Sequence, residues 1–523
     1  MKIVSVHQMQ SIEKAADESG TSYLKMMETA GRRVATWIHE SYPTAASVVG
    51  LVGSGNNGGD TLIALTWLSS WGLRTTAFLA KKRESDRLAA SYLHTGGSIV
   101  DISKSENLDY LEAAIEPGTI VLDGILGTGL KLPLKGALRN VMGSVYALLE
   151  NRAGVRLVAV DCPSGVDCDT GEVSEVTLTA DDTLYMAAMK QGLLKHPARE
   201  KAGELHPIDI GIGEISNYIP ERLPEMITCD SVKKYLPERP FESHKGTFGT
   251  CLVIAGTQSY TGAAYLTGKA AYRAGCGLVH IATTAIVHQS LAGHLPEAVW
   301  TILPDCDGGY GAKGIENLVK TISKADSVVI GPGWGLEDSN IPFLTALLES
   351  IPSDLSTVFD ADGLKLLRQI PEWWKKLPER SVLTPHPGEM SILTGFETSE
   401  IQSNRWEIAR KYAEKWGVCL VLKGAETVVA DHEGSIWVNP ISEPALATAG
   451  SGDVLSGLIG GLLAQGTLKN KAAVASVWLH GQAGILAKVE LGTDRCVTAV
   501  DILNATPEAF GLIYESTLKK LIK

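Results

Sequence analysis

The sequence predicts an α/β protein with mostly parallel sheets, divided into two domains. Strand-like apolar runs alternate with helix-like segments along the whole chain, as in parallel sheets covered by helices. The runs are nearly continuous and do not alternate with polar residues, as expected for strands buried on both faces. At 523 residues the chain is too long for one hydrophobic core, so two or three domains are expected.

The composition is that of a globular protein with an excess of acidic groups. Hydrophobic residues make up 45% of the chain, and the net charge of −12 argues against a nucleic-acid groove. The eight cysteines form no C-x-x-C pair and lie mostly in apolar runs, which favours small buried residues over zinc ligands or disulfides. The first residues do not resemble a signal peptide, and no apolar run reaches membrane-spanning length. We therefore expect a cytoplasmic protein without membrane contacts.

Five strand-like runs lie in the first half of the chain. They cover residues 46–53, 75–80, 119–124, 155–161 and 182–187. Residues 61–72 carry apolar side chains at helical spacing, and residues 8–40 also predict helix, with Met26, Met27, Ala30, Val34 and Ile38 forming one stripe. These segments predict a first domain over residues 1–215.

Residues 216–240 predict a linker, because they combine several prolines with mixed charge and no sustained apolar run. A second domain is expected over residues 241–523. Its strands are predicted within 243–256, 278–283, 326–335, 356–363, 381–389 and 418–427, followed by a hairpin over 427–439. Helices are predicted over 261–277 and after residue 452. The halves do not repeat each other, which indicates fusion and not duplication.

Two loops rich in glycine each contain an aspartate. The first is GSGNNGGD at 53–60, with Asp60, and the second is TAGSGDVLSG at 448–457, with Asp453. In the second loop Gly450 and Gly452 let the backbone approach a phosphate, and the start of the following helix favours negative charge. Asp453 is then either the base for a hydroxyl that attacks a phosphoryl group or the N-cap of that helix.

Further polar loops follow other strands of the second half. Lys423 and Thr427 flank a glycine in LKGAET (422–427), a composition suited to phosphate contacts. His386 stands between two prolines in TPHPGE (384–389), where a core position is not expected. GPGWG (331–335) is a glycine loop at a strand end, the edge at which open α/β sheets bind ligands. Together these loops favour a ligand site over simple packing.

Three strand ends in the first half deliver oxygen atoms to one edge of the predicted sheet. Asn56 and Asn57 follow the first strand, Asp123 ends the third, and Asp161 and Ser164 follow the fourth. Amide, carboxylate and hydroxyl oxygens suit a hard cation as well as a phosphate. Each loop alone could be an ordinary turn built on Asn or Asp. The three in succession favour a binding site.

The motifs SHKGTFG, GPGWG, FDADG, TPHPGE, KGAET and AGSGD resemble the ribokinase-like fold, and more narrowly the NAD(P)H-hydrate dehydratase family, over about residues 243–510. The resemblance implies phosphorylation of the C6 hydroxyl of hydrated NAD(P)H, followed by loss of phosphate. The donor is ADP in bacterial members of the family and ATP in eukaryotic ones, and the fusion of both domains in one chain favours ADP. Mg²⁺ is expected as cofactor because phosphoryl transfer gains from charge neutralisation. The nucleotide is expected at Lys423, Gly424, Ala425, Glu426, Thr427 and Gly452. The hydrate is expected at Ala263, Gly333, His386 and Asp453, with Asp453 as the catalytic base.

The motifs NNGGD, LDGILGTG and DCPSGVD resemble the Rossmann-like, three-layer NAD(P)H-hydrate epimerase family over about residues 1–215. The resemblance implies K⁺ bound by Asn57, Asp123 and Ser164. It implies hydrate binding by Asn56, Asn57, Gly58, Gly59, Asp60, Gly127, Thr128, Gly129, Leu130, Lys131, Leu132 and Pro133, with Asp161 as the catalytic carboxylate. The family usually continues NNGGDG, whereas Thr61 stands here; we expect adjusted geometry and retained activity. Lys190 is either a phosphate contact or an ordinary surface lysine.

The expected function is therefore bifunctional repair of a damaged cofactor. An isomerase half would interconvert the R and S hydrates, and a lyase half would dehydrate the S form with ADP, giving AMP and phosphate. Both halves resemble domains that commonly self-associate, so a homo-oligomer is expected. The alternative is a ribokinase-like small-molecule kinase fused to a nucleotide-binding or regulatory Rossmann-like domain.

Overall fold

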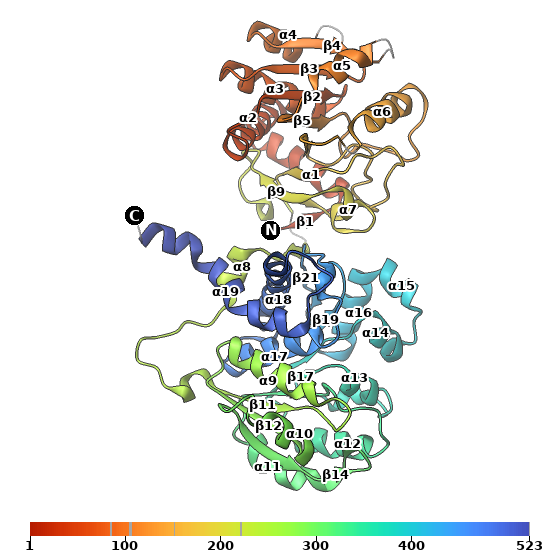
Figure 1. The fold of residues 1–523 in the computed structure, drawn as a ribbon. Coiled ribbons are helices and arrows are strands. Elements are labelled where there is room, and N and C mark those ends of the chain that lie inside the picture. The colour runs from red at the N-terminus through yellow and green to blue at the C-terminus, as the bar shows by residue number, and fades with distance from the viewer. Residues whose placement is uncertain (84–85, 104–106, 151, 220–221, 522–523) are drawn as a thin grey trace. The chain divides into compact units, whose positions relative to one another are not determined.

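The computed structural model describes residues 1–523 except 84–85, 104–106, 151, 220–221 and 522–523. The chain divides into two compact units, Met1–Leu223 and Pro224–Lys523. Each unit has its own central sheet with helices on both sides (Figure 1). In the described part of the chain, no helix combines the length and the apolar character needed to cross a membrane.

The first unit is organised around a seven-stranded sheet in the order β4-β3-β2-β5-β6-β7-β9. Every neighbouring pair in it is parallel. The strands are β2 (Ser47–Val52), β3 (Thr75–Leu79), β4 (Ser98–Asp101), β5 (Thr119–Gly124), β6 (Arg156–Val160), β7 (Asp182–Met186) and β9 (Glu204–Ile208). The short strands β1 (Ile3–Val4) and β8 (Met189–Lys190) form a separate parallel pair.

The two faces of this sheet are covered by different helices. These are α1 (Val6–Glu18), α2 (Tyr23–Ser41), α3 (Asn56–Ser70), α4 (Arg87–His94), α5 (Leu108–Ala114), α6 (Gly136–Leu149) and α7 (Ala198–Lys201). Val48 and Val52 of β2 pack into a core with α1 to α4, whereas Val49 and Leu51 pack into a second core with α5 and α6. Because successive strand side chains point to opposite faces, this division produces three layers. The predicted three-layer α/β architecture is thus present.

The opening helical region is interrupted where the sequence predicted one stripe over residues 8–40. Helix α1 ends at Glu18, and Gly20 has a φ of 108°, a conformation that favours glycine. The Ser22 hydroxyl then accepts a hydrogen bond from the Lys25 backbone N–H and caps α2. The apolar stripe of α2 remains, with Met26, Ala30, Val34 and Ile38 buried.

The second unit contains a ten-stranded sheet in the order β10-β21-β20-β19-β18-β17-β16-β11-β12-β13. Strand β20 is antiparallel to both neighbours, and all other pairs are parallel. The strands are β10 (Glu225–Met226), β11 (Thr250–Ile254), β12 (Leu278–Thr284), β13 (Val299–Leu303), β16 (Ser327–Ile330), β17 (Ser356–Phe359), β18 (Ser381–Leu383), β19 (Cys419–Leu422), β20 (Val428–Ala430) and β21 (Ile436–Val438). β14 (Asp305–Cys306) and β15 (Gly309–Tyr310) form a small antiparallel pair.

Helix α17 is the central helix of this unit, and its residues from Val454 to Ala464 are all buried. It approaches α9 and the sheet closely at glycines. A Cβ at Gly457 would lie 2.2 Å from the Thr267 carbonyl oxygen, and one at Gly460 would lie 2.4 Å from Val329 Cγ2. Larger residues would push the helix away, so these glycines fix where its N-terminus meets the strand ends.

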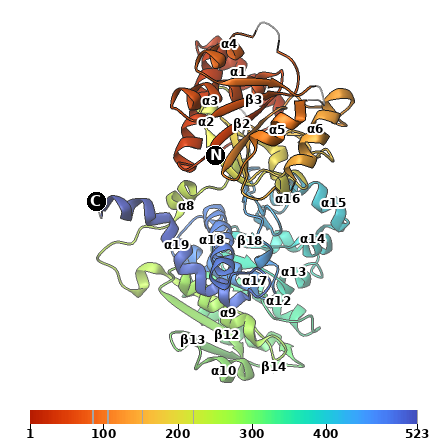
Figure 2. The same ribbon diagram turned by 45° about the horizontal axis from the view of Figure 1, so that its top comes forward.

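Helices surround this sheet, and Figure 2 shows α17 and α18 beside it. The helices are α8 (Cys229–Tyr235), α9 (Thr261–Arg273), α10 (Ala285–Leu291), α11 (Ile315–Ile322), α12 (Asn340–Ser350), α13 (Asp362–Leu367), α14 (Pro387–Thr394), α15 (Thr398–Ser403), α16 (Arg405–Trp416), α17 (Ser451–Ala464), α18 (Lys469–Leu491) and α19 (Ala499–Leu521). The architecture is again α/β with a mostly parallel sheet.

Part of the segment expected to be a linker is folded into the second unit. Strand β10 pairs with β21, and the Ile227 backbone N–H continues the pairing by donating to the Val438 carbonyl. Thr228 and Ser231 form a reciprocal cap at the start of α8, whose Val232 is buried. A two-residue strand and a two-turn helix leave too weak a periodicity for the sequence to reveal. Residues 220–221 of the expected linker lie outside the described residues.

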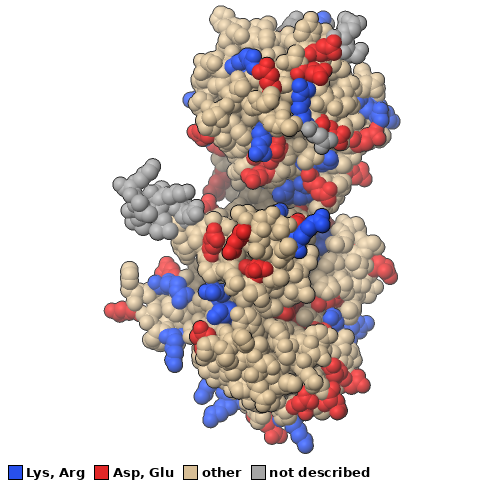
Figure 3. Space-filling view, in the orientation of Figure 1, with Lys and Arg blue, Asp and Glu red and all other residues tan. Residues whose placement is uncertain are grey.

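Lysine, arginine, aspartate and glutamate side chains are intermixed on the face of the molecule shown in Figure 3. Among the described residues on that face, no continuous basic surface of the kind that binds nucleic-acid backbones is visible.

Candidate functional sites

The predicted cation ligands of the first unit meet at the carboxyl ends of three strands. Asn57 lies in the first turn of α3, and its Nδ2 donates to the Leu126 carbonyl at 2.8 Å. Ser164 donates twice to Asp123, from its N–H to Oδ2 (2.7 Å) and from its hydroxyl to Oδ1 (2.5 Å). The Leu126 N–H donates to the Ser164 hydroxyl oxygen (2.8 Å). The structure thus brings Asn57, Asp123 and Ser164 together around Leu126.

This cluster has the composition of a monovalent-cation site. Asp123 is only 1% exposed, and burial raises the pKa of its carboxyl although the hydrogen bonds from Ser164 oppose the shift. The Asn57 Oδ1 is buried and has no hydrogen-bond partner among the described residues. A buried carboxylate beside an unsatisfied amide oxygen and a backbone carbonyl fits a hard cation. The residues present therefore fit K⁺.

Close backbone contacts explain the glycines and the unusual threonine of this loop. A Cβ at Gly53 would lie 1.8 Å from the Ile125 carbonyl oxygen, and one at Gly58 would lie 2.1 Å from the Gly53 carbonyl oxygen. Thr61 is fully buried, and its hydroxyl donates to the Asn57 carbonyl (2.8 Å). A Cβ at Gly124 would lie 1.9 Å from that hydroxyl oxygen. Thr61 therefore fits because its neighbour on β5 has no side chain.

The 127–133 loop starts at the cation cluster and continues outward. A Cβ at Gly127 would lie 3.2 Å from the Asn57 Cβ, so the loop begins against that residue. Gly129, Lys131 and Pro133 are exposed. The structure places the first residue of the predicted hydrate loop at the site, with the following residues open to solvent.

Asp161 forms a buried ion pair that the sequence did not reveal. It follows β6 with a φ of 65°, a left-handed conformation that is costly for a non-glycine residue. Its Oδ1 accepts from the Lys190 Nζ at 2.5 Å and from the Met186 N–H at 3.0 Å. Lys190 is only 1% exposed, so it is neither a surface lysine nor an accessible phosphate contact. In the sequence, the only indication that Lys190 is buried was its position in a largely apolar run.

Two further carboxyl groups, those of Asp60 and Glu13, lie close enough to Asp161 and Lys190 for these charges to shift their pKa values. Burial raises the pKa of Asp60 well above its usual range, and the charges of Asp161 and Glu13 raise it further. Burial also raises the pKa of Glu13, which Lys190 opposes. Asp60 was predicted as a substrate contact, whereas Glu13, from α1, was missed because its helix lies far from the motifs in sequence. Asp60 is thus a carboxyl group that retains its proton more readily than a free aspartate.

In the second unit a half-buried lysine and a buried aspartate connect the ends of β19 and β17. The Lys423 Nζ lies 2.6 Å from the Asp360 Oδ1 and 3.8 Å from the Glu389 Oε2. The Ser456 hydroxyl of α17 donates to the other Asp360 oxygen at 2.5 Å. Burial alone would raise the pKa of Asp360, but Lys423 and these hydrogen bonds hold it below its usual value. Asp360 is therefore the ionised partner of this pair.

Asp453 stands in the first turn of α17, close to that pair. Burial raises its pKa to about 7, and the negative charge of Asp360 adds to the shift. The N-cap of α17 is Gly450, with a φ of 85° and no side-chain cap, so the alternative role of Asp453 as N-cap does not hold. A Cβ at Gly452 would lie 3.2 Å from the Lys423 Nζ, so glycine keeps the approach to the helix N-terminus open.

His386 caps α14 through one ring nitrogen. Its Nδ1 accepts from the backbone N–H groups of Gly388 (3.1 Å) and Glu389 (3.2 Å). Because backbone N–H groups can only donate, the proton of the neutral ring must be on Nε2, which lies 3.3 Å from the Glu389 Oε1. Burial and the nearby Lys423 lower the pKa of His386. His386 is therefore a neutral hydrogen-bond donor.

A cavity of about 660 Å³ connects most of the predicted residues of this unit. Its lining includes His386, Lys423, Gly424, Ala425, Thr427, Gly452 and Asp453. Glu426 is 4% exposed and is not part of the lining, although its neighbours in the loop are. The sequence did not indicate a role for Arg405 of α16. Its side chain donates to the Leu422 carbonyl (2.8 Å), which directly precedes the 423–427 loop.

Ala263 and Gly333 lie against each other at the same edge of the sheet. Gly333 has a φ of 63°, and a Cβ there would lie 2.7 Å from the Ala263 Cβ. The Thr257 hydroxyl donates to the Gly333 carbonyl (3.0 Å) and holds the turn. Neither residue is part of the cavity lining described above.

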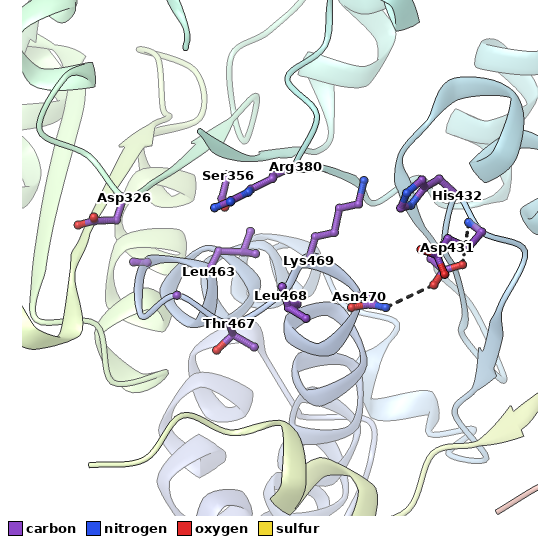
Figure 4. A pocket seen from close by; sticks show the side chains of 13 residues that line it. Asp326, Ser356, Arg380, Asp431, His432, Leu463, Thr467, Leu468, Lys469 and Asn470 are labelled. Atoms are coloured by element: carbon purple, nitrogen blue, oxygen red, sulfur yellow. Dashed lines mark hydrogen bonds between the residues drawn. The ribbon is translucent and has the colours of Figure 1, made fainter. Parts of the chain in front are cut away.

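A second cavity of about 510 Å³ lies at the opposite edge of this sheet, where strands begin (Figure 4). Its polar groups are largely engaged in holding loops together. The Lys469 Nζ donates to the carbonyls of Glu379 (2.8 Å) and Gly417 (3.2 Å), and the Asn470 Nδ2 donates to the Asp431 Oδ2 (3.3 Å). This cavity contains none of the predicted site residues.

Comparison with known proteins gives matches along nearly the whole chain. The family profile described as NAD(P)H-hydrate dehydratase matches residues 251–508, and the one described as YjeF-related protein N-terminus matches residues 24–192. The bifunctional NAD(P)H-hydrate repair enzyme Nnr of Thermofilum pendens is 34% identical over 99% of each chain. The Escherichia coli enzyme of that name is 31% identical over 94% of this chain and 90% of its own.

Among solved structures, an ADP/ATP-dependent NAD(P)H-hydrate dehydratase of Bacillus subtilis, co-crystallised with ATP and Mg²⁺, is 31% identical. It covers 55% of this chain and 99% of its own, with a TM-score of 0.47. A ribokinase-like superfamily protein of Enterococcus faecalis is 26% identical and covers 55% of this chain and 96% of its own, with a TM-score of 0.48.

Replacing Lys423 with methionine is expected to destabilise the second unit by about 3–5 kcal/mol, because it leaves the Asp360 carboxylate buried without its cation. The double variant Lys423→Met/Asp360→Asn should regain much of this loss, since the neutral amide still accepts from Ser456. Chemical denaturation of the wild-type protein, the two single variants and the double variant measures the four free energies of unfolding. Additive losses in the double variant would contradict the ion-pair interpretation.

Proposed function

The chain belongs to the family of bifunctional NAD(P)H-hydrate repair enzymes, and we propose that its two units carry out the two steps of that repair. The first unit interconverts the R and S hydrates of NAD(P)H. The second unit dehydrates the S form at the expense of ADP, releasing AMP and phosphate. The observation that carries the dehydratase assignment is Asp453, a carboxyl group with a pKa of about 7 in the first turn of α17, at a cavity lined by Lys423 and its loop.

In the dehydratase unit Asp453 accepts the proton of the C6 hydroxyl as that oxygen attacks the terminal phosphorus of ADP. The N-terminus of α17 and the 423–427 loop bind the phosphates. The lone pair of the ring nitrogen then expels the C6 phosphate, and loss of the C5 proton restores the ring double bond. His386 assists as an Nε2–H donor. It does not serve as the base, because its Nδ1 lone pair is engaged by the backbone of α14.

The dehydratase site also fits Mg²⁺. Asp360, Asp362 and Glu389 all lie close enough to Asp453 to raise its pKa, whereas Lys423 lowers it. Carboxylates in excess of cations repel the phosphates of ADP unless a divalent ion neutralises the charge. The oxygens of Asp360 already accept from Lys423 and Ser456. Those of Asp362 accept from Lys365 and the Gly335 N–H. Mg²⁺ would therefore be held mainly by phosphate oxygens of ADP, and the nearby carboxylates would favour its positive charge. When bound, the ion stabilises the charge that develops on the transferred phosphoryl group.

In the epimerase unit Asp161 handles the hydroxyl proton at C6. Asp60 donates a proton to the C6 hydroxyl as the ring nitrogen expels it as water. Asp161 accepts a proton from the water that adds to the other face of the ring, and exchange with solvent restores both carboxyl groups. Lys190 orients Asp161 by donating to its Oδ1, while the raised pKa of Asp60 favours its protonated form nearby. The hydrate lies against residues 56–60 and 127–133 in this proposal. K⁺ bound by Asn57, Asp123 and Ser164 would order the strand ends that form the site.

The donor and the cellular setting complete the proposal. ADP is the donor expected from the sequence, and assays with ADP and ATP in parallel decide between them. Recovery of NADH absorbance marks repair, whereas a stable phosphorylated product without recovered NADH would identify a kinase instead. A cytoplasmic location and a homo-oligomeric state remain expectations from the sequence.

Each catalytic aspartate should affect only one activity. Asp453→Asn is expected to lower dehydration of the S hydrate by at least about 100-fold, the usual contribution of a general base, while R-to-S conversion continues. Asp161→Asn should lower R-to-S conversion and leave dehydration of the S hydrate unchanged. The two variants serve as controls for each other, with an enzyme-free sample correcting for spontaneous epimerisation. Loss of both activities in either variant would argue against the division of labour.

The dehydratase activity should rise with pH around neutrality. Asp453 acts as a base only when ionised, and its raised pKa of about 7 means that the protonated form dominates below that pH. The kcat/KM for the S hydrate should therefore rise about tenfold per pH unit below 7 and level off above it. Because the pKa of Glu389 is also raised to about 7, the variant Glu389→Gln identifies the responsible group. A pH profile that vanishes in this variant would reject Asp453 as the titrating base.

Removal of K⁺ should weaken the first unit and slow epimerisation. Exchange of KCl for choline chloride at equal ionic strength is expected to lower both the R-to-S rate and the Tm of the first unit. The fall in Tm follows because the ion binds only the folded cluster. In Asp123→Asn the salt dependence of Tm should disappear. Equal Tm values for the wild-type protein in both salts would contradict the assignment.

A further inference from the structure

One part of the dehydratase cavity contains a buried polar atom without a partner. Asn439 directly follows β21, lines the cavity and is 3% exposed. The Oδ1 of Asn439 has no hydrogen-bond partner among the described residues of the cavity lining. Burying an amide oxygen without a donor costs about 1–3 kcal/mol. A ligand that brings a donor to this place would remove that cost.

The orientation of the Asn439 amide is fixed by its other contacts. Its Nδ2 donates to the Val477 carbonyl of α18 at 3.3 Å, and a carbonyl can only accept. The amide therefore cannot turn over to present Nδ2 in place of Oδ1. Its backbone N–H donates to the Thr427 carbonyl at 2.9 Å. Asn439 is thus tied to the last residue of the predicted nucleotide loop, with its side-chain oxygen as an obligate acceptor.

The surroundings of Asn439 suit the base of a nucleotide. The cavity wall here is mostly apolar and includes Ile441, Pro444, Leu446, Ala447 and Val477. Helix α18 lies close to this wall because it carries glycines: a Cβ at Gly481 would lie 2.9 Å from the Ile441 Cδ1, and one at Gly484 would lie 2.5 Å from the Leu446 Cδ2. If the phosphates of the nucleotide bind at the N-terminus of α17, the aromatic base occupies this apolar part of the cavity.

Other polar side chains also line this wall, among them Ser442, Glu443 and His480. The carboxylate of Glu443 accepts from the Ala445 N–H (3.1 Å) and from the Lys488 Nζ (3.3 Å). His480 of α18 is 8% exposed, and its Nε2 lies 2.9 Å from the hydroxyl of Ser451, the first residue of α17. Burial lowers the pKa of His480 to about 4, so the ring is neutral at physiological pH. This contact links the helix that carries His480 to the phosphate end of the cavity. In this lining Asn439 contributes a buried side-chain acceptor that has no donor among the described residues.

We propose that Asn439 selects adenine nucleotides, because its Oδ1 accepts a hydrogen bond from the exocyclic amino group of adenine. Hypoxanthine and guanine carry a carbonyl oxygen at the same position, which would place an acceptor against an acceptor. The proposal rests on the assignment of this cavity to the phosphoryl donor and adds the chemical feature by which the donor's base is recognised. Discrimination of this kind is strong when the wrong ligand leaves a buried polar group unpaired.

The test compares ADP with IDP, which replaces the amino group with a carbonyl oxygen at position 6. Isothermal titration calorimetry on the full-length protein gives the two Kd values, and the repair assay gives the two values of kcat/KM. We expect ADP to bind about tenfold more tightly or better, the fold-change expected when one buried acceptor lacks its donor. In Asn439→Leu the ratio should fall to about one.

The control is the same substitution at Asn470, at the opposite edge of the sheet (Figure 4). Asn470→Leu also loses a side-chain hydrogen bond and should keep the full preference for ADP. Equal affinity of the wild-type protein for ADP and IDP would overturn the proposal even if Asn439→Leu failed to fold. Retained preference in a folded Asn439→Leu would also overturn it. Either result would leave the dehydratase assignment intact as long as ADP supports repair. Absence of repair with every nucleotide tested would reject the proposed function itself.

Discussion

A lysine paired with a strand-end aspartate sets the electrostatics of both candidate sites. In the second unit the ammonium group of Lys423 keeps Asp360 ionised at the carboxyl end of β17, and in the first unit Lys190 contacts Asp161 after β6. In each case another carboxyl group nearby has a raised pKa, namely Asp453 and Asp60. A single cation can neutralise only one carboxylate fully. The second carboxyl group therefore retains its proton more readily than a free aspartate, and for Asp453 the pKa is about 7.

Glycines place these charged groups by allowing backbone contacts that side chains would prevent. In the first unit Gly53 and Gly58 let the start of α3 meet the end of β5. In the second unit Gly457 and Gly460 seat α17 against α9 and the sheet, which brings Ser456 to Asp360. The glycines at the helix starts expose N–H groups to a ligand, and those within α17 determine where that helix starts in space. Glycines at the helix starts and glycines within α17 are thus close in sequence but have different physical roles.

The sequence predicted the architecture and the edge of each sheet at which the sites lie, because strand-end loops keep their order in an α/β fold. Asn57, Asp123 and Ser164 meet as their positions indicated, and His386, Lys423 and Asp453 line one cavity. The partners of these residues could not be predicted. Asp360 is 63 positions from Lys423, and nothing local shows which lysine pairs with it. Arg405 and Glu13 lie on helices whose patterns indicate only an amphipathic surface, so their place beside the sites depends on packing.

The reversed strand β20 has a consequence for studying this enzyme. Because β20 and β21 run out and back, the chain leaves the cavity edge at Thr427 and returns to it at Asn439, with the turn at residues 431–435 on the far edge. His432 in that turn is exposed (Figure 4). A fluorescent label there would be attached to the pair of strands that brings Thr427 and Asn439 to the dehydratase cavity, without entering that cavity. The hairpin therefore offers a place to observe ligand occupancy from the opposite side of the sheet.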